Sequence, residues 1–336
     1  MRIALTYNLR RDASEADAEF DTEETIAAIT GYVAALGHDV SPLDVTGSIP
    51  RVIARLARLR PDLVLNLAEG ERGVFREAFY PALFEQLGYP HTGSSASVLA
   101  LCLDKALAKR VVAAAGVGVP AGELVRDRRA LPHVPLPALV KPNFEGSSKG
   151  ITAASVVTSR AMLATRVREL LARYPDGVLV EQFVAGLDVS VAWVAGLGVL
   201  PPIAYRYPCD GPHAIYDFAL KTAARANVRV EIPAQVGADI TARLEAVAAR
   251  TYAALGVTGY GRADYRVTAG GELVFLEMNP LPSLAPGDND LYGASAVRGV
   301  TASQLFEFIL ASSRERAEDC RPERSSGLRS AGACRH

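Results

Sequence analysis

The sequence has little cysteine, almost no net charge and no long hydrophobic run. Its four cysteines include no Cys-x-x-Cys pair, which argues against a zinc site or a disulfide framework and favours a reducing cytosol. The formal net charge is −1, so nothing in it favours nucleic acid or an acidic membrane as a partner. The longest apolar stretch, residues 189–203, contains glycines and prolines and is too short to span a membrane. We therefore expect a cytoplasmic protein that binds small molecules.

The first 94 residues alternate between strand and helix patterns. Strands are expected at residues 2–7, 39–43 and 63–67. Asp21 and Thr22 can cap a first helix that ends before Gly37, and further helices are expected at residues 48–59 and 75–87. This β-α-β-α-β order implies a parallel sheet with helices on its faces.

The rest of the chain continues as α/β until about Ser312. One long helix is expected over Ser95–Ala115, and another over Arg160–Arg173. Strands are expected at residues 138–141, 151–157 and 177–181. Residues 313–336 carry few apolar side chains, so they predict a disordered tail.

Two segments near the C-terminal end combine apolar strands with polar side chains. Gly261–Asp264 and Glu277–Pro280 flank a Gly-rich turn, which predicts a hairpin. Asp264, Glu277 and Asn279 would bring together the hard oxygen ligands that Mg²⁺ prefers, with Arg262 beside them for a transferring phosphoryl group. A solvated hairpin is the alternative, but these polar groups lie within apolar strands.

Val140–Pro142 and the turn Gly146–Gly150 predict a phosphate-binding site. A lysine at the end of a buried strand is costly unless it meets a charge. The Gly/Ser turn can present backbone N–H groups to phosphate oxygens. Many ordinary hairpins contain such a turn, so the proximity of Lys141 carries this interpretation.

Three further features are undiagnostic on their own. Val178–Val184 and Asp188 could bind adenine and ribose, but they could equally be a buried strand and a turn. Lys105 lies on a helix, where most lysines face solvent. Lys221 lies in a polar and aromatic segment without clear periodicity.

Taken in order, these segments resemble the D-alanine–D-alanine ligase family of the ATP-grasp superfamily over Met1 to about Ser312. The landmarks are Tyr89–Ser94, Leu103–Lys105, Val140–Pro142, Glu145–Ser148, Val180–Phe183, Gly261–Asp264 and Glu277–Asn279. The resemblance implies a three-domain α/β fold, in which a Rossmann-like domain precedes two α+β domains that clamp ATP. Residues 1–94 would form the N-terminal domain, 95–184 the central subdomain, 185–312 the C-terminal subdomain with the metal site, and 313–336 the tail.

The resemblance also implies an ATP site. Its members here would be Lys105, Lys141, Glu181, Gln182, Phe183, Val184, Asp188 and Lys221. Lys105 and Lys141 would contact phosphates, residues 181–184 would form the adenine hinge, and Asp188 would meet the ribose. Lys221 would reach the phosphates from a loop over the site.

The implied reaction joins a carboxylate to an amine. ATP would phosphorylate the carboxylate, and the amine would attack the acyl-phosphate, with release of ADP and phosphate. Asp264, Glu277 and Asn279 would hold two Mg²⁺ ions, which Mn²⁺ could replace. Arg262, Ser147 and Lys221 would be the catalytic residues, acting by positioning and charge neutralisation.

The substrate-binding segments depart from the family pattern. The expected His-Gly is Glu69-Gly70, and the carboxylate for a substrate ammonium could come from Asp21, Glu23 or Glu24. We take Asp21 and Glu69 as candidate substrate contacts.

Departures continue near the second substrate's expected site. The loop tyrosine expected after Lys221 is Thr222, and the Ser-Leu pair that would receive a substrate carboxylate is Asp288-Asn289. Ser283 and Asp288 are candidate contacts, and an Asp there would repel a carboxylate. We therefore hypothesise that at least the nucleophilic substrate differs from D-alanine and is an amine or a cationic amino acid.

Two alternatives remain open at this point, and a third fails. The chain could catalyse another ATP-grasp reaction with a different acceptor, or it could be a nucleotide-binding protein without turnover. A dinucleotide-binding oxidoreductase fits the N-terminal pattern but lacks a GxGxxG, since Asn8–Arg11 stands at the first turn. The family resemblance suggests a homodimer through the N-terminal domain.

Overall fold

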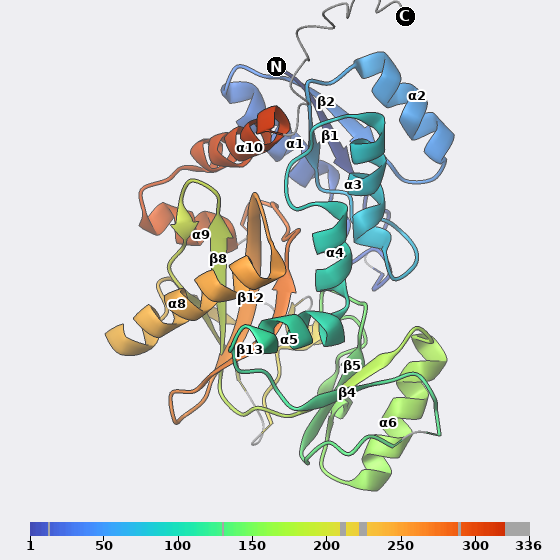
Figure 1. Ribbon diagram of the computed structural model, residues 1–336, viewed down its shortest axis with the longest axis vertical. Coiled ribbons are helices and arrows are strands. Elements are labelled where there is room, and N and C mark those ends of the chain that lie inside the picture. Colours follow the sequence, from blue (N-terminus) through green and yellow to red (C-terminus); the bar gives the residue numbers. More distant parts are fainter. Residues whose placement is uncertain (13, 130, 209–212, 222–226, 288–289, 320–336) are drawn as a thin grey trace, which may run out of the picture.

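The computed structural model contains three β-sheets. It describes residues 1–319 except residues 13, 130, 209–212, 222–226 and 288–289. In Figure 1 the N-terminal elements lie at one end and the central sheet with its helix lies at the other. Among the described residues, no helix is both long and apolar enough to cross a membrane.

The N-terminal sheet is parallel, with the strand order β2-β1-β3. Its elements are β1 (Arg2–Tyr7), α1 (Glu23–Ala35), β2 (Asp39–Asp44), α2 (Ile49–Leu59), β3 (Leu63–Asn66) and α3 (Arg76–Leu87). Thr22 caps α1 by accepting a hydrogen bond from the Thr25 backbone N–H at 3.3 Å. The predicted element order is therefore confirmed in this part of the chain.

The single long helix expected after residue 95 is wrong. The chain forms α4 (Ala96–Leu103) and α5 (Lys105–Ala114), which are separated by the extended residue Asp104. The Asp104 carboxylate accepts hydrogen bonds from the Leu107 backbone N–H at 3.0 Å and from Asn143 Nδ2 at 2.7 Å. An aspartate that caps a new helix competes with helix continuation, and here it places Lys105 at the start of α5.

The central sheet is antiparallel, with the order β4-β7-β5-β6. Its elements are β4 (Gly122–Val125), β5 (Ala138–Pro142), β6 (Val156–Val157), α6 (Arg160–Arg173) and β7 (Val178–Gln182). The strand expected over 151–157 is reduced to its last two residues. A short 3₁₀ helix, Ala153–Ser155, precedes them because Thr152 and Ser155 form a local capping box.

The C-terminal sheet has the order β11-β10-β8-β12-β13, and β9 pairs with β8. Its strands are β8 (Leu187–Val194), β9 (Gly198–Val199), β10 (Ile203–Arg206), β11 (Arg229–Glu231), β12 (Tyr260–Val267) and β13 (Leu273–Asn279). The helices of this part are α7 (Phe218–Lys221), α8 (Ala238–Leu255), α9 (Asp290–Val297) and α10 (Ala302–Asp319).

The disordered tail predicted for residues 313–336 is wrong over residues 313–319. Helix α10 runs to Asp319, so residues 313–319 are helical, and Ser313 is buried. The rings of Tyr32 on α1 and Phe306 on α10 stack with centroids 6.0 Å apart. One core cluster includes Ile29 of α1 and Phe306 of α10, so the end of the chain is packed on its N-terminal part. Residues 320–336 lie outside the described part.

Candidate active site

The hairpin of β12 and β13 brings the predicted metal ligands together. Its register pairs Arg262 with Asn279 and Asp264 with Glu277. Residues two apart on a strand share a face, so all four side chains gather on one side. Arg262 binds Asp264 through two hydrogen bonds of 2.9 and 3.0 Å. Lys105 Nζ lies 3.6 Å from Glu277 Oε2.

Two groups at the hairpin also have structural partners. Ser190 Oγ on β8 donates to Asp264 Oδ1 at 2.6 Å. Asn279 Oδ1 accepts from the Leu281 backbone N–H at 3.0 Å. These bonds fix the direction of both side chains. Asp264 Oδ1 accepts from both Ser190 and Arg262, whereas Asp264 Oδ2 and Asn279 Oδ1 each keep a lone pair for another partner.

A first cavity of about 210 Å³ lies between the central and C-terminal sheets. Its polar lining residues include Lys141, Ser148, Asp188, Arg262, Asp264, Arg266 and Glu277. A smaller neighbouring cavity of about 50 Å³ is lined by residues 181–184 and shares Lys141 and Arg266 with the first. These two cavities together offer basic groups, carboxylates and an apolar slot beside a strand edge. This set of groups fits ATP with Mg²⁺.

A second cavity of about 240 Å³ adjoins the first. The N-terminal part contributes Glu19, Asp21, Thr25, Glu69 and Glu77, and the rest includes Lys105, Ser147, Phe218, Asn279 and Ser283. Arg262 and Glu277 line both cavities. A group bound in one cavity can therefore meet a group bound in the other at these two side chains.

The Gly/Ser turn separates the two cavities. Ser147 and Ser148 have positive φ values of 49° and 57°, which bend the backbone sharply between β5 and the 3₁₀ helix. Ser147 lines the second cavity and Ser148 the first. A Cβ at Gly146 would lie 2.0 Å from Glu19 Oε1, so a side chain there would require the Glu19 carboxylate to move.

Comparisons with known proteins agree on one family. A family model described as D-ala D-ala ligase C-terminus matches residues 125–311. A D-alanine–D-alanine ligase of Sinorhizobium fredii is 35% identical over 268 residues, which cover 77% of this chain and 82% of that protein. One from Anaeromyxobacter is 32% identical over 292 residues, covering 84% and 87%. The chain belongs to the D-alanine–D-alanine ligase family.

Solved structures place the same fold on the whole chain. D-alanine–D-alanine ligase from Bacillus anthracis, complexed with ATP, aligns with a TM-score of 0.76 at 19% identity and covers 95% of this chain and 99% of its own. VanG D-Ala:D-Ser ligase from Enterococcus faecalis aligns with a TM-score of 0.73 at 21% identity, covering 93% and 99%. The predicted ATP-grasp fold is confirmed, and the chain is an ATP-grasp ligase of the type that uses ATP and Mg²⁺.

Sequence reasoning missed a buried lysine of this ligase. Lys109 Nζ lies 2.7 Å from Glu181 Oε2 and donates to the Leu276 carbonyl oxygen at 2.5 Å. Lys141 Nζ lies 2.8 Å from Glu181 Oε1. Burial lowers the pKa of Lys109 to about 8, and Glu181 opposes this shift. The available signal was its spacing, because residues 105 and 109 lie one turn apart on the same helix face.

Lys109 links β7 to β13, because it contacts Glu181 on the first strand and Leu276, which precedes Glu277, on the second. We expect Lys109→Met to raise the KM for ATP by about 10- to 100-fold, as a lost charge-assisted hydrogen bond is worth roughly 1.5–3 kcal/mol. Steady-state kinetics would measure it. Lys109→Arg should restore part of the loss, and Arg110→Met, at the exposed neighbouring position, is the control. An unchanged KM in Lys109→Met would contradict the linkage.

Asp188 has protein partners where ribose contact was predicted. Arg266 Nε donates to Asp188 Oδ1 at 2.5 Å, and the Tyr207 hydroxyl donates to Asp188 Oδ2. Arg266 also lies over the Phe183 ring, 5.3 Å from its centroid. Arg266, which sequence reasoning missed, therefore orients both a hinge residue and Asp188. Its position four residues after Arg262 on the same strand was the available signal.

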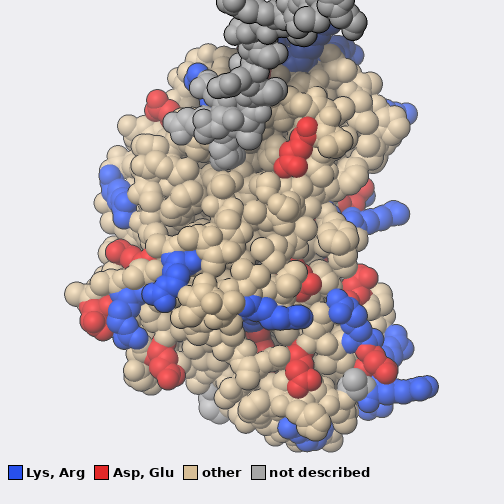
Figure 2. Space-filling model, viewed as in Figure 1, with Lys and Arg blue, Asp and Glu red and all other residues tan. Residues whose placement is uncertain are grey.

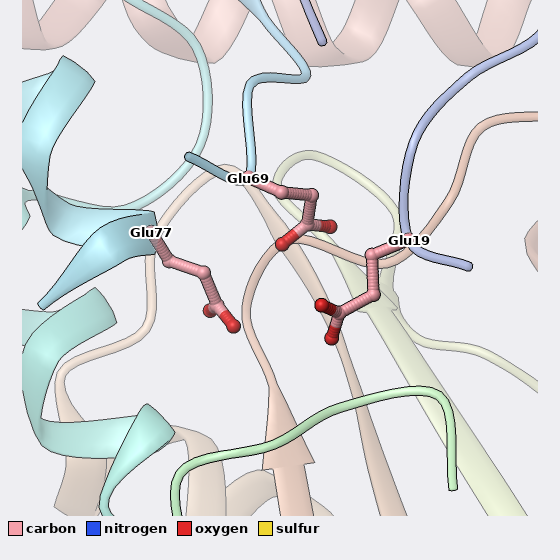
Figure 3. Close-up of side chains that lie close together, drawn as sticks. All are labelled: Glu19, Glu69 and Glu77. Carbon is pink, nitrogen blue, oxygen red and sulfur yellow. The ribbon is translucent and has the colours of Figure 1, made fainter. Parts of the chain in front are cut away.

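Glu19 and Glu77 were also missed, and they lie at the second cavity. Figure 3 shows the carboxylates of Glu19, Glu69 and Glu77 pointing toward one another, and carboxylate oxygens of the three lie within 4.8 Å of each other. Glu23 and Glu24, considered earlier beside Asp21, are exposed in the first turn of α1, so they do not face the cavity. Tertiary contact assembles this cluster from three separate segments.

Two predicted residues cannot be placed. Asp288 and Thr222 lie outside the described residues. The backbone of Lys221 ends α7, but its side chain is not described. Asp21 and Ser283 do line the second cavity, as does Glu69.

Asp21 makes stability depend on pH in a defined direction. Burial raises the pKa of Asp21 to about 7, whereas an unfolded aspartate titrates near ~3.9. The native state binds this proton more tightly than the unfolded state does. The protonated Asp21 therefore contributes fully to the free energy of unfolding below pH ~4, and this contribution is lost as pH rises through about 7. We expect Asp21→Asn to melt several degrees above the wild type at pH 8 and to lose most of that advantage at pH 5. Melting curves with equal differences at both values would contradict this.

Proposed function

We propose that this chain joins a carboxylate to an amine through an acyl-phosphate, releasing ADP and phosphate, and that at least one substrate is not D-alanine. The observation that carries the proposal is the meeting of two cavities at Arg262 and Glu277. One cavity has the shape and charge for a nucleotide, and the other has charged and polar groups suited to amino acids or amines. Phosphoryl transfer needs both reactants held in line across such a junction.

The nucleotide side of the site follows from the first cavity and its neighbour. Lys105 and Lys141 contact phosphates in this proposal, and residues 181–184 bind adenine. Asp188, oriented by Arg266, accepts from the ribose. Lys221, at the end of α7, reaches the phosphates in this proposal.

The reacting side of the site lies at the β12–β13 hairpin. Asp264, Glu277 and Asn279 would hold the divalent ions, which neutralise phosphate charge when bound. Arg262 stabilises the transferring phosphoryl group, and its bidentate bond to Asp264 sets its direction. Ser147 lies at the turn between the cavities, where its backbone can meet phosphate oxygens.

The substrate proposal rests on the second cavity. Asp21 and Glu69 line it with three further glutamates, and Ser283 is on its wall. Carboxylates favour a positively charged ligand over the uncharged methyl side chain of alanine. The Asp288-Asn289 pair in place of the family's Ser-Leu points in the same direction.

An omission assay tests the reaction and its substrates. The full chain is incubated with ATP, Mg²⁺ and pairs drawn from amino acids of both chiralities and simple amines, and phosphate release is followed. We expect release only with a complete pair, and mass spectrometry to find an amide product. If none of the pairs gives phosphate release, the ligase activity is refuted. Exclusive use of two D-alanines would refute only the substrate proposal.

Assembly and location are proposed on separate grounds. Helix α3 and the residue before it expose Phe75 and Phe79, at 65% and 45%, which favours a homodimer through the N-terminal domain. Sedimentation of the wild type and of Phe79→Ser would test this.

We also propose a cytoplasmic location and the domain limits 1–94, 95–184 and 185–312. On the face in Figure 2, basic and acidic side chains are interspersed.

A further inference from the structure

The second cavity holds more negative charge than its own cations offset. Five of its lining residues are carboxylates and three are cations, namely Arg10, Lys105 and Arg262. Glu277 lies on β13, and the other four carboxylates come from the β1–α1 segment, the loop after β3 and helix α3. They are Glu19, Asp21, Glu69 and Glu77. Each buried carboxylate needs a cation or hydrogen-bond donors to remain ionised.

Glu19 is the member with full partners. Arg76 Nη2 lies 3.2 Å from both of its oxygens, and Lys149 Nζ donates to it as well. Arg76 and Lys149 also lie 3.7 and 3.5 Å from Glu145. Arg76 and Lys149 thus form ion pairs with Glu19 and Glu145, and Lys105 forms one with Glu277. Of these cations only Arg76 also approaches one of the other three carboxylates, Glu77, and none of them makes an ion pair with Asp21 or Glu69.

The remaining carboxylates have few partners among the described residues. Neither Glu69 nor Asp21 has a side-chain hydrogen bond or ion pair there, and the sole contact of Glu77 is Arg76 at 3.7 Å. Glu77 is 7% exposed and faces the cavity. Burial and the neighbouring carboxylates raise the pKa of Glu69 well above its usual range, and burial raises that of Glu77 to about 7. The cavity is thus arranged for a positive charge that the chain does not supply.

A tyrosine hydroxyl gives an independent observation. Tyr260 is 0% exposed, and its hydroxyl has no hydrogen-bond partner in the described part of the chain. It lies two residues before Arg262 on β12 and therefore on the same face of the strand. Tyr260 lies behind the residues that line the cavity, and burial and then the charges of Glu69 and Asp21 raise its pKa. A phenol oxygen can accept from an ammonium N–H.

We propose that this cavity binds a substrate that carries a second cationic nitrogen besides its amino group, such as a basic amino acid or a diamine. The inference rests on the proposed ligase function and names the substrate class of the same site. Glu69, Glu77 and Asp21 accept from the cationic group, with Tyr260 behind them. Arg262 and Glu277, which line the same cavity, lie where the reacting end of that substrate must arrive.

A metal ion is a poorer occupant of this cluster. The cavity of about 240 Å³ has room for a small molecule and is continuous with the reacting residues. Glu19, which would be needed as a third ligand, already accepts from Arg76 and Lys149. Two cations beside a metal ion would oppose its binding.

The test compares each cationic compound with a neutral isostere. Phosphate release with ATP and Mg²⁺ is measured for lysine and ornithine of both chiralities against norleucine and norvaline, and for cadaverine against pentylamine. We expect kcat/KM for at least one cationic compound to exceed that of its isostere by about 100-fold or more, because an unpaired buried carboxylate rejects the neutral analogue. The amino acid and diamine arms separate the two sources of the cation.

Variants identify the residues responsible. In a double variant, Glu69→Gln with Glu77→Gln, the ratio of kcat/KM between the cationic compound and its neutral isostere should fall below about tenfold. Glu71→Gln, an exposed glutamate two residues after Glu69, is the matched control and should keep it. Melting temperature and ATP binding confirm that each variant is folded. Thermal shifts with lysine and with norleucine give a second readout that does not need turnover.

Several outcomes would overturn the inference. Equal use of norleucine and lysine by the wild type would do so while leaving the ligase function intact, as would a preference that survives both glutamine substitutions. Stabilisation by Mg²⁺ or Ca²⁺ without nucleotide, lost in the double variant, would assign the cluster to a metal. If no compound gives phosphate release, the ligase function fails, and a thermal shift with lysine alone would still support a cation site.

Discussion

Glu277→Gln is expected to lower Mg²⁺-dependent phosphate release by on the order of 10²–10³-fold, the usual effect of losing one preorganised electrostatic contact to a transition state. Glu277 lines both cavities, lies opposite Asp264 in the hairpin and faces Lys105. The amide keeps the shape of the side chain but removes the charge that would bind a divalent ion. Turnover at saturating ATP, measured across a Mg²⁺ titration, gives the effect, and the Mg²⁺ requirement should rise.

The control for this prediction lies in the same hairpin. Glu272 is exposed at the turn between β12 and β13, so Glu272→Gln should retain full turnover. A decrease of less than about tenfold in Glu277→Gln would place the metal site elsewhere. Wild-type protein that binds ATP without any turnover would favour the alternative of a non-catalytic nucleotide-binding protein.

Arg76→Met is expected to cause the largest loss of stability. The guanidinium is 7% exposed and donates to the Phe144 carbonyl oxygen at 2.5 Å and to Glu19. Its removal leaves buried carboxylates without their main cation, which costs about 3–5 kcal/mol. The melting temperature should fall by roughly 10 °C. Because Arg76 connects α3 to the Gly/Ser turn, the KM for the amine substrate should change as well.

Arg72→Met provides the comparison for this loss. Arg72 is exposed in the same loop, and the substitution should leave the melting temperature within about 2 °C of the wild type. The deficit of Arg76→Met should also shrink at low pH, because protonation of Glu19 and Glu77 removes the uncompensated charges. Equal melting temperatures for the two variants would mean that the Arg76 network contributes little.

Elements with strong local signals were predicted well. Thr22 and Ser159 cap α1 and α6 where the periodic apolar residues begin, and the β12–β13 hairpin follows its Gly-rich turn. The errors occur where a side chain formed a local alternative. Asp104 ends one helix and begins the next through a bond to Asn143, which lies 39 residues away. The spacing of apolar residues along the chain carries no information about such a contact.

The grouping of side chains at the β12–β13 hairpin was predictable because these residues are close together in the chain. Arg262 and Asp264 are two residues apart, and a strand necessarily puts them on one face. The carboxylate cluster was not predictable in this way. Glu19, Glu69 and Glu77 belong to separate segments. Glu69 was a candidate through the family resemblance, but nothing in the sequence placed Glu19 or Glu77 beside it.

The sequence by itself determined the ligase class and most of the order of the elements, because these depend on short motifs and on the fixed periods of strand and helix. The tertiary structure alone decided that α10 packs on α1, that Lys109 joins β7 to β13, and that three glutamates face one cavity. Burial is a property of the assembled molecule. It changes a solvated carboxylate into a group that needs a cation, and no local pattern in the chain encodes that change.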